Sequence, residues 1–296
     1  MVGALAALRG EFGAGKGMSG FLDDMARASA ARVGEALQHE SAAALERRAR
    51  AAPPSPPLRL SASGFDVIAE LKLRSPAAGR LGDAGQDWLG RVAAYARAGA
   101  AAVSVLTEPS RFDGSLTHLR EAAAVLAPLG VPAMRKDFLV DAYQVLEARA
   151  AGAGGVLVIL RMLPGARIAE LMDVAAEHGM FVLLEAFDGA DLEAARDVLT
   201  SRPRRAAPRE APILIGINCR DLSTLEVVQE RFAALAPMLP PGWPAVAESG
   251  VNSAGDARRV QQLGYGAALI GTALMAREDP SQLLREIFDA TRTVKP

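Results

Sequence analysis

The chain has 296 residues, half of them hydrophobic, which is enough for one large α/β barrel or for two ordinary domains. Its formal net charge of −1 gives no sign of a surface for nucleic acid or for an anionic membrane, so we expect neither partner. The single cysteine, Cys219, excludes an internal disulfide framework and fits a reducing compartment.

The first residues do not resemble a targeting segment. The stretch MVGALAALRGEFGAGKG is only briefly apolar, has no basic residue before its apolar part and lacks a convincing cleavage site. No run in the sequence approaches the length of a membrane-spanning helix. We therefore expect a soluble, cytoplasmic protein.

The N-terminal segment predicts two helices followed by a connector. Residues 18–51 are rich in Ala, Arg, Glu and Leu, and Ser19 is suited to the N-cap of the first helix. A second helix is predicted from Ser41 to Arg50. Residues 53–57, PPSPP, cannot continue a helix and predict a connector.

From the connector onward, short apolar runs alternate with Ala-rich segments of helical period. The runs are continuous, as expected for strands that are buried on both faces. We predict eight strands, at 66–72, 101–106, 131–135, 154–160, 180–185, 213–217, 244–248 and 266–270. Helices are predicted between them at 86–98, 115–127, 141–151, 166–177, 189–199 and 254–263. Glycines suited to a helix C-terminus follow several of these, at Gly99, Gly130, Gly152, Gly179 and Gly264.

Eight strands that alternate with helices predict a single (β/α)8 barrel. A doubly wound open sheet is the alternative, but no Gly-rich dinucleotide-binding fingerprint follows the first strand. We therefore assign residues 1–58 to a helical extension with its linker and residues 59–296 to the catalytic barrel. The basic, Pro-rich stretch 200–212 predicts an exposed insertion, and a solvated loop is a better interpretation of it than a partner-binding segment.

Lysine is scarce in this chain. Of 33 basic residues only four are lysines, namely Lys16, Lys72, Lys136 and Lys295. Arginine can replace lysine on a solvated surface, but not where chemistry needs a compact ammonium whose pKa can be lowered and whose proton can be given away. Lys72 and Lys136 each end an apolar run, VIAELK and PAMRKDF. Because both lysines stand at the end of a predicted strand, we favour a functional role for them over chance.

Three carboxylates also stand at predicted strand ends, where barrel enzymes carry their catalytic residues. They are Glu70, Glu185 and Glu248. Glu70 lies inside an apolar run, where an unpaired charge is costly, so we expect it to pair with Lys72 or Lys136. Carboxylates and lysines that converge on one barrel mouth would perturb one another's pKa values, as acid–base catalysis requires.

The last two strand ends predict a phosphate site. ESG at 248–250 and IGTA at 270–273 place Gly and small hydroxyl residues where barrels commonly bind phosphate. A glycine allows close approach of the backbone, and amides at a helix start donate hydrogen bonds. A small, phosphorylated substrate is therefore expected.

Histidine and cysteine add no catalytic group to this set. His39, His118 and His178 lie in predicted helices or at their ends, and we expect each at the surface. Because no cluster of His, Cys and Asp ligands is present, we expect no metal. Side-chain alternation points Cys219 away from the face of Asn218, which favours a packing role over a nucleophile.

Six stretches together resemble the indole-3-glycerol phosphate synthase family of tryptophan biosynthesis. They are IAELKLRSPAAG (68–79), SVLTEPSRFDGSLTHL (104–119), PAMRKDFLVDAYQVLEARAAGAGGVLVI (132–159), IGINCRDLSTLEV (215–227), AVAESGV (245–251) and LIGTALM (269–275). The RKDF block and GIN-x-RDL are the specific motifs, whereas ESG and IGTAL recur in other phosphate-binding barrels. The helical N-terminus matches the extension that the family carries before its first strand.

The resemblance implies a carboxy-lyase that needs no cofactor. Its substrate would be 1-(2-carboxyphenylamino)-1-deoxyribulose 5-phosphate. The aniline ring would attack the ribulose carbonyl, and CO2 and then water would leave to give indole-3-glycerol phosphate. We expect a monomer or a weak homodimer.

The resemblance also implies a role for each site residue. Lys136 would be the general acid on the carbonyl, and Lys72 would assist at the carboxylate end and in the dehydration. Glu185 would stabilise positive charge or act as a base, while Glu70 would orient the lysines and could take a proton in the dehydration. The remaining contacts implied are Asn218 and Glu248 with the sugar hydroxyls, Ser75 and Arg220 with the anionic ends, Phe138 and Leu222 with the substrate, and Ser249, Gly250, Gly271 and Thr272 with the phosphate.

Three positions depart from the family pattern, which usually has Glu-Val-His, Asn-Asn and Ser-Pro-Ser. Here the sequences are Glu185-Ala186-Phe187, Asn218-Cys219 and Ser75-Pro76-Ala77. They leave open a paralogous Schiff-base aldolase or synthase, in which a lysine of lowered pKa attacks a sugar carbonyl. A non-catalytic binding subunit is a further alternative, although lysines freed from catalysis could have become arginines. The related isomerase of the pathway is disfavoured because its Cys/Asp acid–base pair is not visible.

Overall fold

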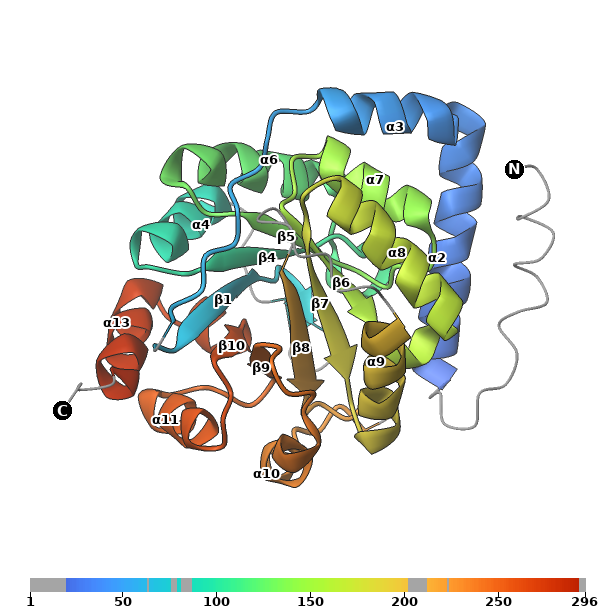
Figure 1. Cartoon of the computed structure of the whole chain (residues 1–296). Coiled ribbons are helices and arrows are strands. Elements are labelled where there is room, and N and C mark those ends of the chain that lie inside the picture. The colour runs from blue at the N-terminus through green and yellow to red at the C-terminus, as the bar shows by residue number, and fades with distance from the viewer. Residues whose placement is uncertain are drawn as a thin grey trace.

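Eight parallel strands close into a barrel at the centre of the molecule (Figure 1). The computed structural model describes residues 20–62, 64–75, 79–80, 87–201, 212–222 and 224–292. Around the barrel the strand order is β1-β10-β9-β8-β7-β6-β5-β4. The strands are β1 (Asp66–Leu71), β4 (Ala102–Leu106), β5 (Ala133–Lys136), β6 (Gly155–Ile159), β7 (Phe181–Ala186), β8 (Ile213–Asn218), β9 (Ala245–Glu248) and β10 (Ala267–Ile270). The predicted (β/α)8 barrel and its eight strands are confirmed.

Helices connect the strands and surround the barrel. They are α4 (Trp88–Arg97), α5 (Pro109–Phe112), α6 (Leu116–Leu126), α7 (Ala142–Ala150), α8 (Gly165–Glu177), α9 (Gly189–Ser201), α10 (Glu230–Leu235), α11 (Ala254–Gln262), α12 (Thr272–Met275) and α13 (Pro280–Thr291). Each of the six predicted helices is present, and the five glycines expected after helices all have positive φ. The sequence analysis did not predict α5, α10, α12, α13 or the two-residue strands β2 (Arg74–Ser75) and β3 (Gly79–Arg80).

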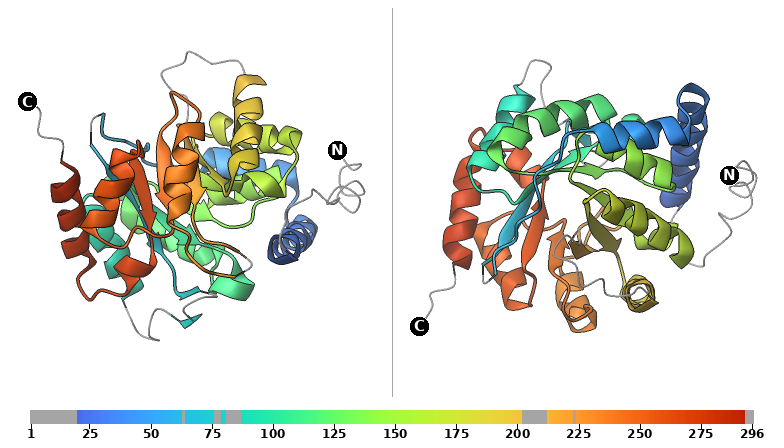
Figure 2. Two further views of the ribbon diagram at one scale, coloured as in Figure 1. Left: turned by 90° about the horizontal axis from the view of Figure 1, so that it is seen from below. Right: turned by 45° about the horizontal axis from the view of Figure 1, so that its top comes forward.

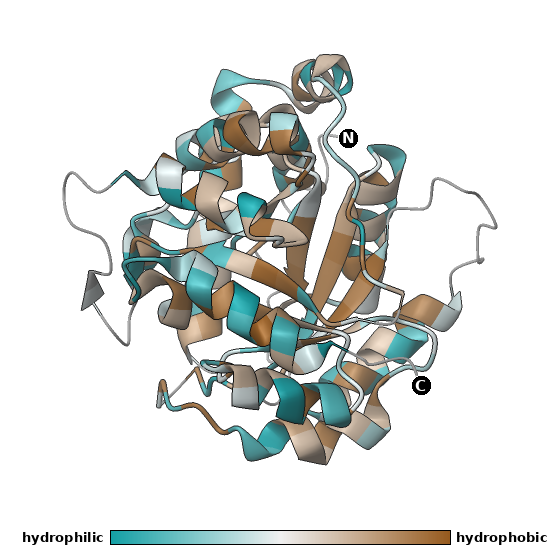
Figure 3. Ribbon diagram, turned by 90° about the vertical axis from the view of Figure 1, so that its left-hand side faces the viewer, coloured by the Kyte–Doolittle hydropathy of each residue, from teal (hydrophilic) through white to brown (hydrophobic). Residues whose placement is uncertain are grey.

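Both faces of every barrel strand are buried, which explains the continuous apolar runs. Successive side chains point alternately into the barrel and out towards the helices. In β1, Ile68 packs with the interior residues, whereas Val67 and Ala69 pack beneath the helices. Coloured by hydropathy, the strands are mostly hydrophobic, and the surrounding helices carry hydrophilic residues as well (Figure 3).

The N-terminal extension lies against one side of the barrel (Figures 1 and 2). It consists of α2 (Gly20–His39) and α3 (Ala42–Ala51), and the hydroxyl of Ser41 caps α3 by accepting from the Ala44 amide. Val33 of α2 and Leu45 of α3 pack with Tyr143 of α7 in a cluster of their own. Ser19 and residues 202–211 of the predicted insertion lie outside the described residues, and the division at residue 58 stays a prediction.

The expectation of a surface position is wrong for one of the histidines. Only 3% of the His178 side chain is exposed, and its Nε2 lies 3.2 Å from Glu46 Oε2, because α3 packs near the end of α8. His118 is half-buried with its ring against that of Trp88, and His39 is exposed as expected. None of the described helices has the length and apolarity needed to span a membrane.

A substitution of Gly155 would test how tightly the barrel interior is packed. It pairs with Phe181 across β6 and β7, and a Cβ at residue 155 would overlap the buried ring of Phe181. We expect Gly155→Ala to lower the free energy of unfolding by about 1–3 kcal/mol, because the ring has no space into which to move. Urea unfolding followed by circular dichroism measures this difference.

Gly34→Ala in α2 is the matched control. A Cβ there meets nothing within 4 Å, so the higher helix propensity of alanine should leave stability unchanged or raise it by up to about 1 kcal/mol. Equal stability of Gly155→Ala and wild type would contradict the tight packing.

Candidate active site

A cavity of about 270 Å³ opens at the C-terminal ends of the barrel strands. All of the predicted site residues except Ser75 line it. They are Glu70, Lys72, Lys136, Phe138, Glu185, Asn218, Arg220, Leu222, Glu248, Ser249, Gly250, Gly271 and Thr272. The backbone of Ser75 belongs to β2, but its side chain lies outside the described part of the structure, as do Pro76 and Ala77.

Lys136 lies among the carboxylates of the cavity. Its Nζ is 2.9 Å from Glu185 Oε2 and 3.7 Å from Glu248 Oε2, and 17% of the side chain is exposed. Burial alone would lower the pKa of Lys136, but Glu185, Glu248 and Glu70 outweigh it, and the pKa lies above its ordinary value. The idea of a lysine with a lowered pKa is therefore wrong for Lys136, which is held as an ammonium.

Glu70 forms an ion pair with Lys72, as expected. The Nζ of Lys72 is 2.9 Å from Glu70 Oε1. Burial alone would raise the pKa of Glu70, but Lys72 and Lys136 outweigh it and lower the pKa below its ordinary value. Gly271 makes this pair possible, since a Cβ there would overlap Glu70 Oε1. That requirement is separate from the phosphate contact proposed for Gly271.

Glu248 is the carboxyl group of the cavity whose pKa is raised. It is 1% exposed, and burial, followed by the charge of Glu185, raises its pKa well above the ordinary value. Its carboxyl group occupies space left by Gly216, whose Cβ would overlap Glu248 Oε1. Among the described residues, neither carboxyl oxygen of Glu248 has a hydrogen-bond partner. A buried polar group of this kind is free to bind a ligand.

Asn218 and Arg220 organise the end of β8. The Asn218 side-chain amide donates to Glu185 Oε1 at 3.2 Å, so Lys136 and Asn218 hold the two oxygens of one carboxylate. Asn218 Oδ1 accepts from the Arg220 amide at 2.9 Å. The Arg220 guanidinium donates to the Leu225 carbonyl at 2.8 Å and thereby braces the loop that borders the cavity.

The predicted phosphate residues lie at the ends of two neighbouring strands. Ser249 and Gly250 follow β9, and Gly271 and Thr272 follow β10, which pairs with β9. Ser249 and Gly250 both have positive φ, at 59° and 108°. Positive φ at a non-glycine residue such as Ser249 is uncommon and is found at binding loops.

The cavity also has an apolar lining, most of which the sequence analysis missed. The rings of Phe21 and Phe112 pack on that of Phe138, with centroids 5.8 and 6.2 Å apart. The other apolar lining residues that were not predicted are Leu106, Leu157, Ile159, Leu225, Val227, Val251, Leu269 and Ile270. Hydropathy alone cannot distinguish such lining residues from core residues. The polar lining residue Asn252 was also missed, because it belongs to no motif that the sequence analysis identified.

Two departures from the family pattern are packing residues. Cys219 is fully buried among the residues beneath the helices, and burial raises its pKa to about 12, which confirms the packing role. Phe187 is also buried, and the Arg161 guanidinium lies 4.7 Å from the centre of its ring. Asp188 and Asp191 hold that guanidinium with ion pairs of 2.6 and 2.7 Å.

Charges of both signs are therefore concentrated in a single cavity. Lys72 and Lys136 lie in the cavity with the three glutamates, and the charges of these neighbours contribute to the pKa shifts of Glu70, Lys136 and Glu248. In the described part of the chain, no group of three or more His, Cys, Asp or Glu side chains could hold a metal ion. The site combines two lysines, three carboxyl groups and aromatic rings in one cavity.

The raised pKa of Glu248 predicts a pH-dependent effect on stability. The pKa of Glu248 is higher in the folded than in the unfolded chain. The free energy of unfolding of the wild-type protein therefore falls as pH rises above the ordinary glutamate pKa. Glu248→Gln should therefore gain stability relative to wild type, by up to about 1.4 kcal/mol per pH unit over this window. Urea unfolding at about pH 5.5 and about pH 8.5 measures the change.

Glu70→Gln is the control with the opposite sign. The pKa of Glu70 is lowered in the fold, so its ion pair contributes stability above the ordinary glutamate pKa and loses it only as pH falls through the lowered value. This variant should be less stable than wild type at both pH values. If the difference in stability between Glu248→Gln and wild type does not change with pH, the raised pKa of Glu248 is contradicted.

Comparison with known proteins gives the same family that the sequence motifs resemble. The family model described as indole-3-glycerol phosphate synthase matches residues 22–287. An indole-3-glycerol phosphate synthase of Parafrankia is 42% identical over 78% of this chain and 80% of its own length. That of Leifsonia xyli is 39% identical over 90% of this chain and 95% of its own length.

Solved structures with a similar fold are more distant in sequence. 3-Hexulose-6-phosphate synthase from Salmonella typhimurium superposes with a TM-score of 0.56 at 12% identity, over 77% of this chain and 98% of its own. Thiamine phosphate pyrophosphorylase from Pyrococcus furiosus gives 0.52 at 14% identity, over 77% and 96%. These two likenesses show the barrel fold alone. The extent of the family match and the identity to its members show that the chain belongs to the indole-3-glycerol phosphate synthase family.

Proposed function

We propose that this protein closes the indole ring of 1-(2-carboxyphenylamino)-1-deoxyribulose 5-phosphate, giving indole-3-glycerol phosphate, CO2 and water in tryptophan biosynthesis. Membership of the family supports this reaction, which makes the protein a carboxy-lyase. The observation that carries the assignment to the cavity is the position of the Lys136 ammonium, 2.9 Å from Glu185 and 3.7 Å from Glu248. No electrons enter or leave the balanced reaction, so no redox cofactor is required.

Lys136 acts as the general acid of ring closure. A carbon of the aniline ring bonds to the carbonyl carbon, and the carbonyl oxygen takes a proton from the Lys136 ammonium. The raised pKa keeps that proton in place until negative charge develops on the oxygen. Glu185, 2.9 Å from the ammonium, stabilises the positive charge that the ring acquires when it loses aromaticity.

Lys72 and Glu70 act in the later steps. The Lys72 ammonium attracts the substrate carboxylate, whose bonding electrons return to the ring as CO2 leaves. Lys72 then protonates the departing hydroxyl as water, and Glu70, 2.9 Å away, accepts the ring proton that is lost. This order balances protons and leaves an aromatic indole.

The remaining lining residues hold the substrate at its two ends. The aromatic wall around Phe138 suits the aniline ring, while Ser249 and Gly250 with Gly271 and Thr272 suit the phosphate. Leu222 contributes apolar contact, Asn218 and Glu248 bind sugar hydroxyls, and Ser75 and Arg220 bind the anionic ends. We propose that the protein is a monomer or a weak homodimer that works in the cytoplasm.

A decisive variant is Lys136→Arg. Arginine keeps the positive charge but does not release a proton near neutral pH, so we expect kcat to fall by at least about 100-fold. Product formation is followed by indole fluorescence after addition of the carboxyphenylamino-deoxyribulose phosphate. Arg292→Lys, at an exposed helix end, is the matched control and should retain wild-type kcat. Retention of full activity by Lys136→Arg would refute the assignment.

Borohydride trapping separates this mechanism from a Schiff-base aldolase. An ammonium of raised pKa is a poor nucleophile, so Lys136 should form no imine with the substrate. Treating the enzyme with borohydride during turnover should leave its mass unchanged. A covalent adduct mapped to Lys136 or Lys72 would instead support the aldolase.

A further inference from the structure

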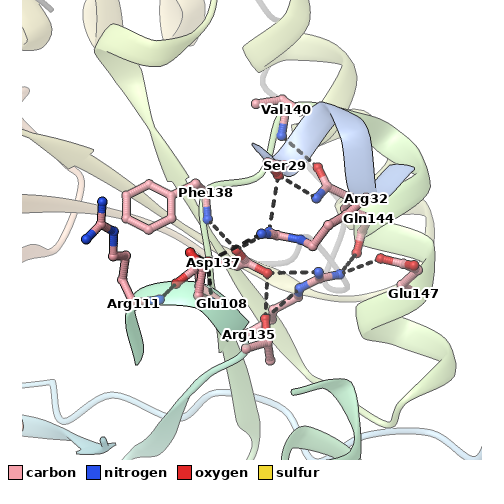
Figure 4. Close-up of polar contacts among 12 residues, drawn as sticks. Ser29, Arg32, Glu108, Arg111, Arg135, Asp137, Phe138, Val140, Gln144 and Glu147 are labelled. Carbon is pink, nitrogen blue, oxygen red and sulfur yellow. Dashed lines mark hydrogen bonds and ion pairs between the residues drawn. The ribbon is translucent and has the colours of Figure 1, made fainter. Parts of the chain in front are cut away.

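A buried polar network joins the N-terminal helix α2 to the strand end that carries Lys136 (Figure 4). Arg32 of α2 places one guanidinium nitrogen 2.7 Å from Asp137 Oδ1 and another 3.6 Å from Glu108 Oε1. Both carboxylate side chains are fully buried, whereas 26% of the Arg32 side chain is exposed. Because a buried carboxylate is strongly unfavourable without a cationic partner, Arg32 matters to both.

Asp137 is the centre of this network. Its Oδ1 accepts from Arg32 and from the Phe138 amide, and its Oδ2 accepts from Thr107 Oγ1 at 2.7 Å and from Arg135 at 3.0 Å. Burial alone would raise the pKa of Asp137, but Arg135 and Arg32 outweigh it and lower the pKa. Four donors therefore fix the orientation of a charged side chain.

The same contacts fix the backbone on both sides of Lys136. The Thr107 amide donates to the Lys136 carbonyl at 3.1 Å, and the Phe138 amide donates to Asp137 at 2.8 Å. Strand alternation points the Lys136 side chain away from Arg135 and into the cavity. The position of the Lys136 ammonium thus depends on the network behind it.

Helix α2 also contacts the segment after β5 at two further places. Ser29 Oγ accepts from Gln144 Nε2 at 2.8 Å, and Gln144 Oε1 accepts from the Val140 amide at 2.8 Å. At the start of the helix, the Phe21 ring meets that of Phe138 edge to face, and both line the cavity. Residues of the extension therefore support the site from behind and form part of its wall.

We propose that Arg32 is a positioning residue for ring closure: through Asp137 it holds the strand end that aims the Lys136 ammonium at the substrate carbonyl. A displacement of about 1 Å at a reacting group can cost about 100-fold in rate. The N-terminal helix is then part of the apparatus that sets kcat. This inference rests on the proposed function, in which Lys136 is the general acid.

The test compares kcat and KM of Arg32→Met, Arg32→Lys and wild type, at a temperature where circular dichroism shows each to be folded. Arg32→Met keeps the apolar stem and removes the charge, so we expect kcat to fall by about 10- to 100-fold while KM changes by less than about threefold. Arg32→Lys retains one ion pair with Asp137 and should recover most of the lost kcat.

Arg27→Met is the matched control, because Arg27 lies on the same helix, is largely exposed and, among the described residues, forms an ion pair with Asp24 alone. It should behave as wild type. Folded Arg32→Met with unchanged kcat, or with a change confined to KM, would overturn the positioning role, as would failure of Arg32→Lys to recover activity. If Arg32→Met does not fold, Arg32→Gln takes its place, because it also removes the charge but keeps a polar side chain: a fall in kcat that Arg32→Lys does not share supports the role, and an unchanged kcat overturns it.

The proposed function can fail separately. Absence of product with the wild-type enzyme would refute the reaction itself, and the inference about Arg32 would fall with it. Wild-type turnover that Arg32→Met leaves unchanged would refute the inference alone.

Discussion

The structure of the site depends on the balance of charge around the Lys136 ammonium. An ammonium withdrawn from water is costly unless carboxylates compensate it, and carboxylates withdrawn from water need cations in turn. Glu185 lies 2.9 Å from Lys136, and Glu70 lies as close to Lys72. The third carboxyl group, that of Glu248, is affected differently, since burial and the nearby Glu185 raise its pKa well above the ordinary value. Each group is stable in the cavity only because the others are present.

Parallel pairing brings these groups together. All eight strands end at one mouth of the barrel, so residues from distant parts of the chain become neighbours across the hydrogen-bonded register. Glu185 pairs with Gly216, and Asn218 pairs with Glu248. Gly216 has no side chain, and the Glu248 carboxyl group fills the space that a side chain would occupy. Behind the mouth, Asp137 ties the strand that carries Lys136 to the N-terminal helix.

Much of the fold could be predicted because it follows from local rules. Continuous apolar runs predicted the eight strands, and glycines of positive φ marked helix ends. The two internal lysines pointed to the cavity because arginine had replaced lysine almost everywhere else. Helices α10 and α13 escaped prediction, and so did the buried contact of His178 with Glu46, which joins residues 132 positions apart. The apolar wall around Phe138 was missed because lining residues and core residues share the same hydropathy.

The sequence by itself determined the order of the strands, six of the helices, the family and the residue types at each strand end, since these depend on patterns within short segments. Only the tertiary structure decided the direction in which the pKa values of those residues shift. The pKa of Lys136 is raised rather than lowered because three glutamates from β1, β7 and β9 act on it at once. The place of Arg32 behind Asp137 was likewise invisible in the sequence, because 105 positions separate the two residues. Electrostatic energies and cavity walls are sums over groups that meet only when the barrel closes, so no local pattern contains them.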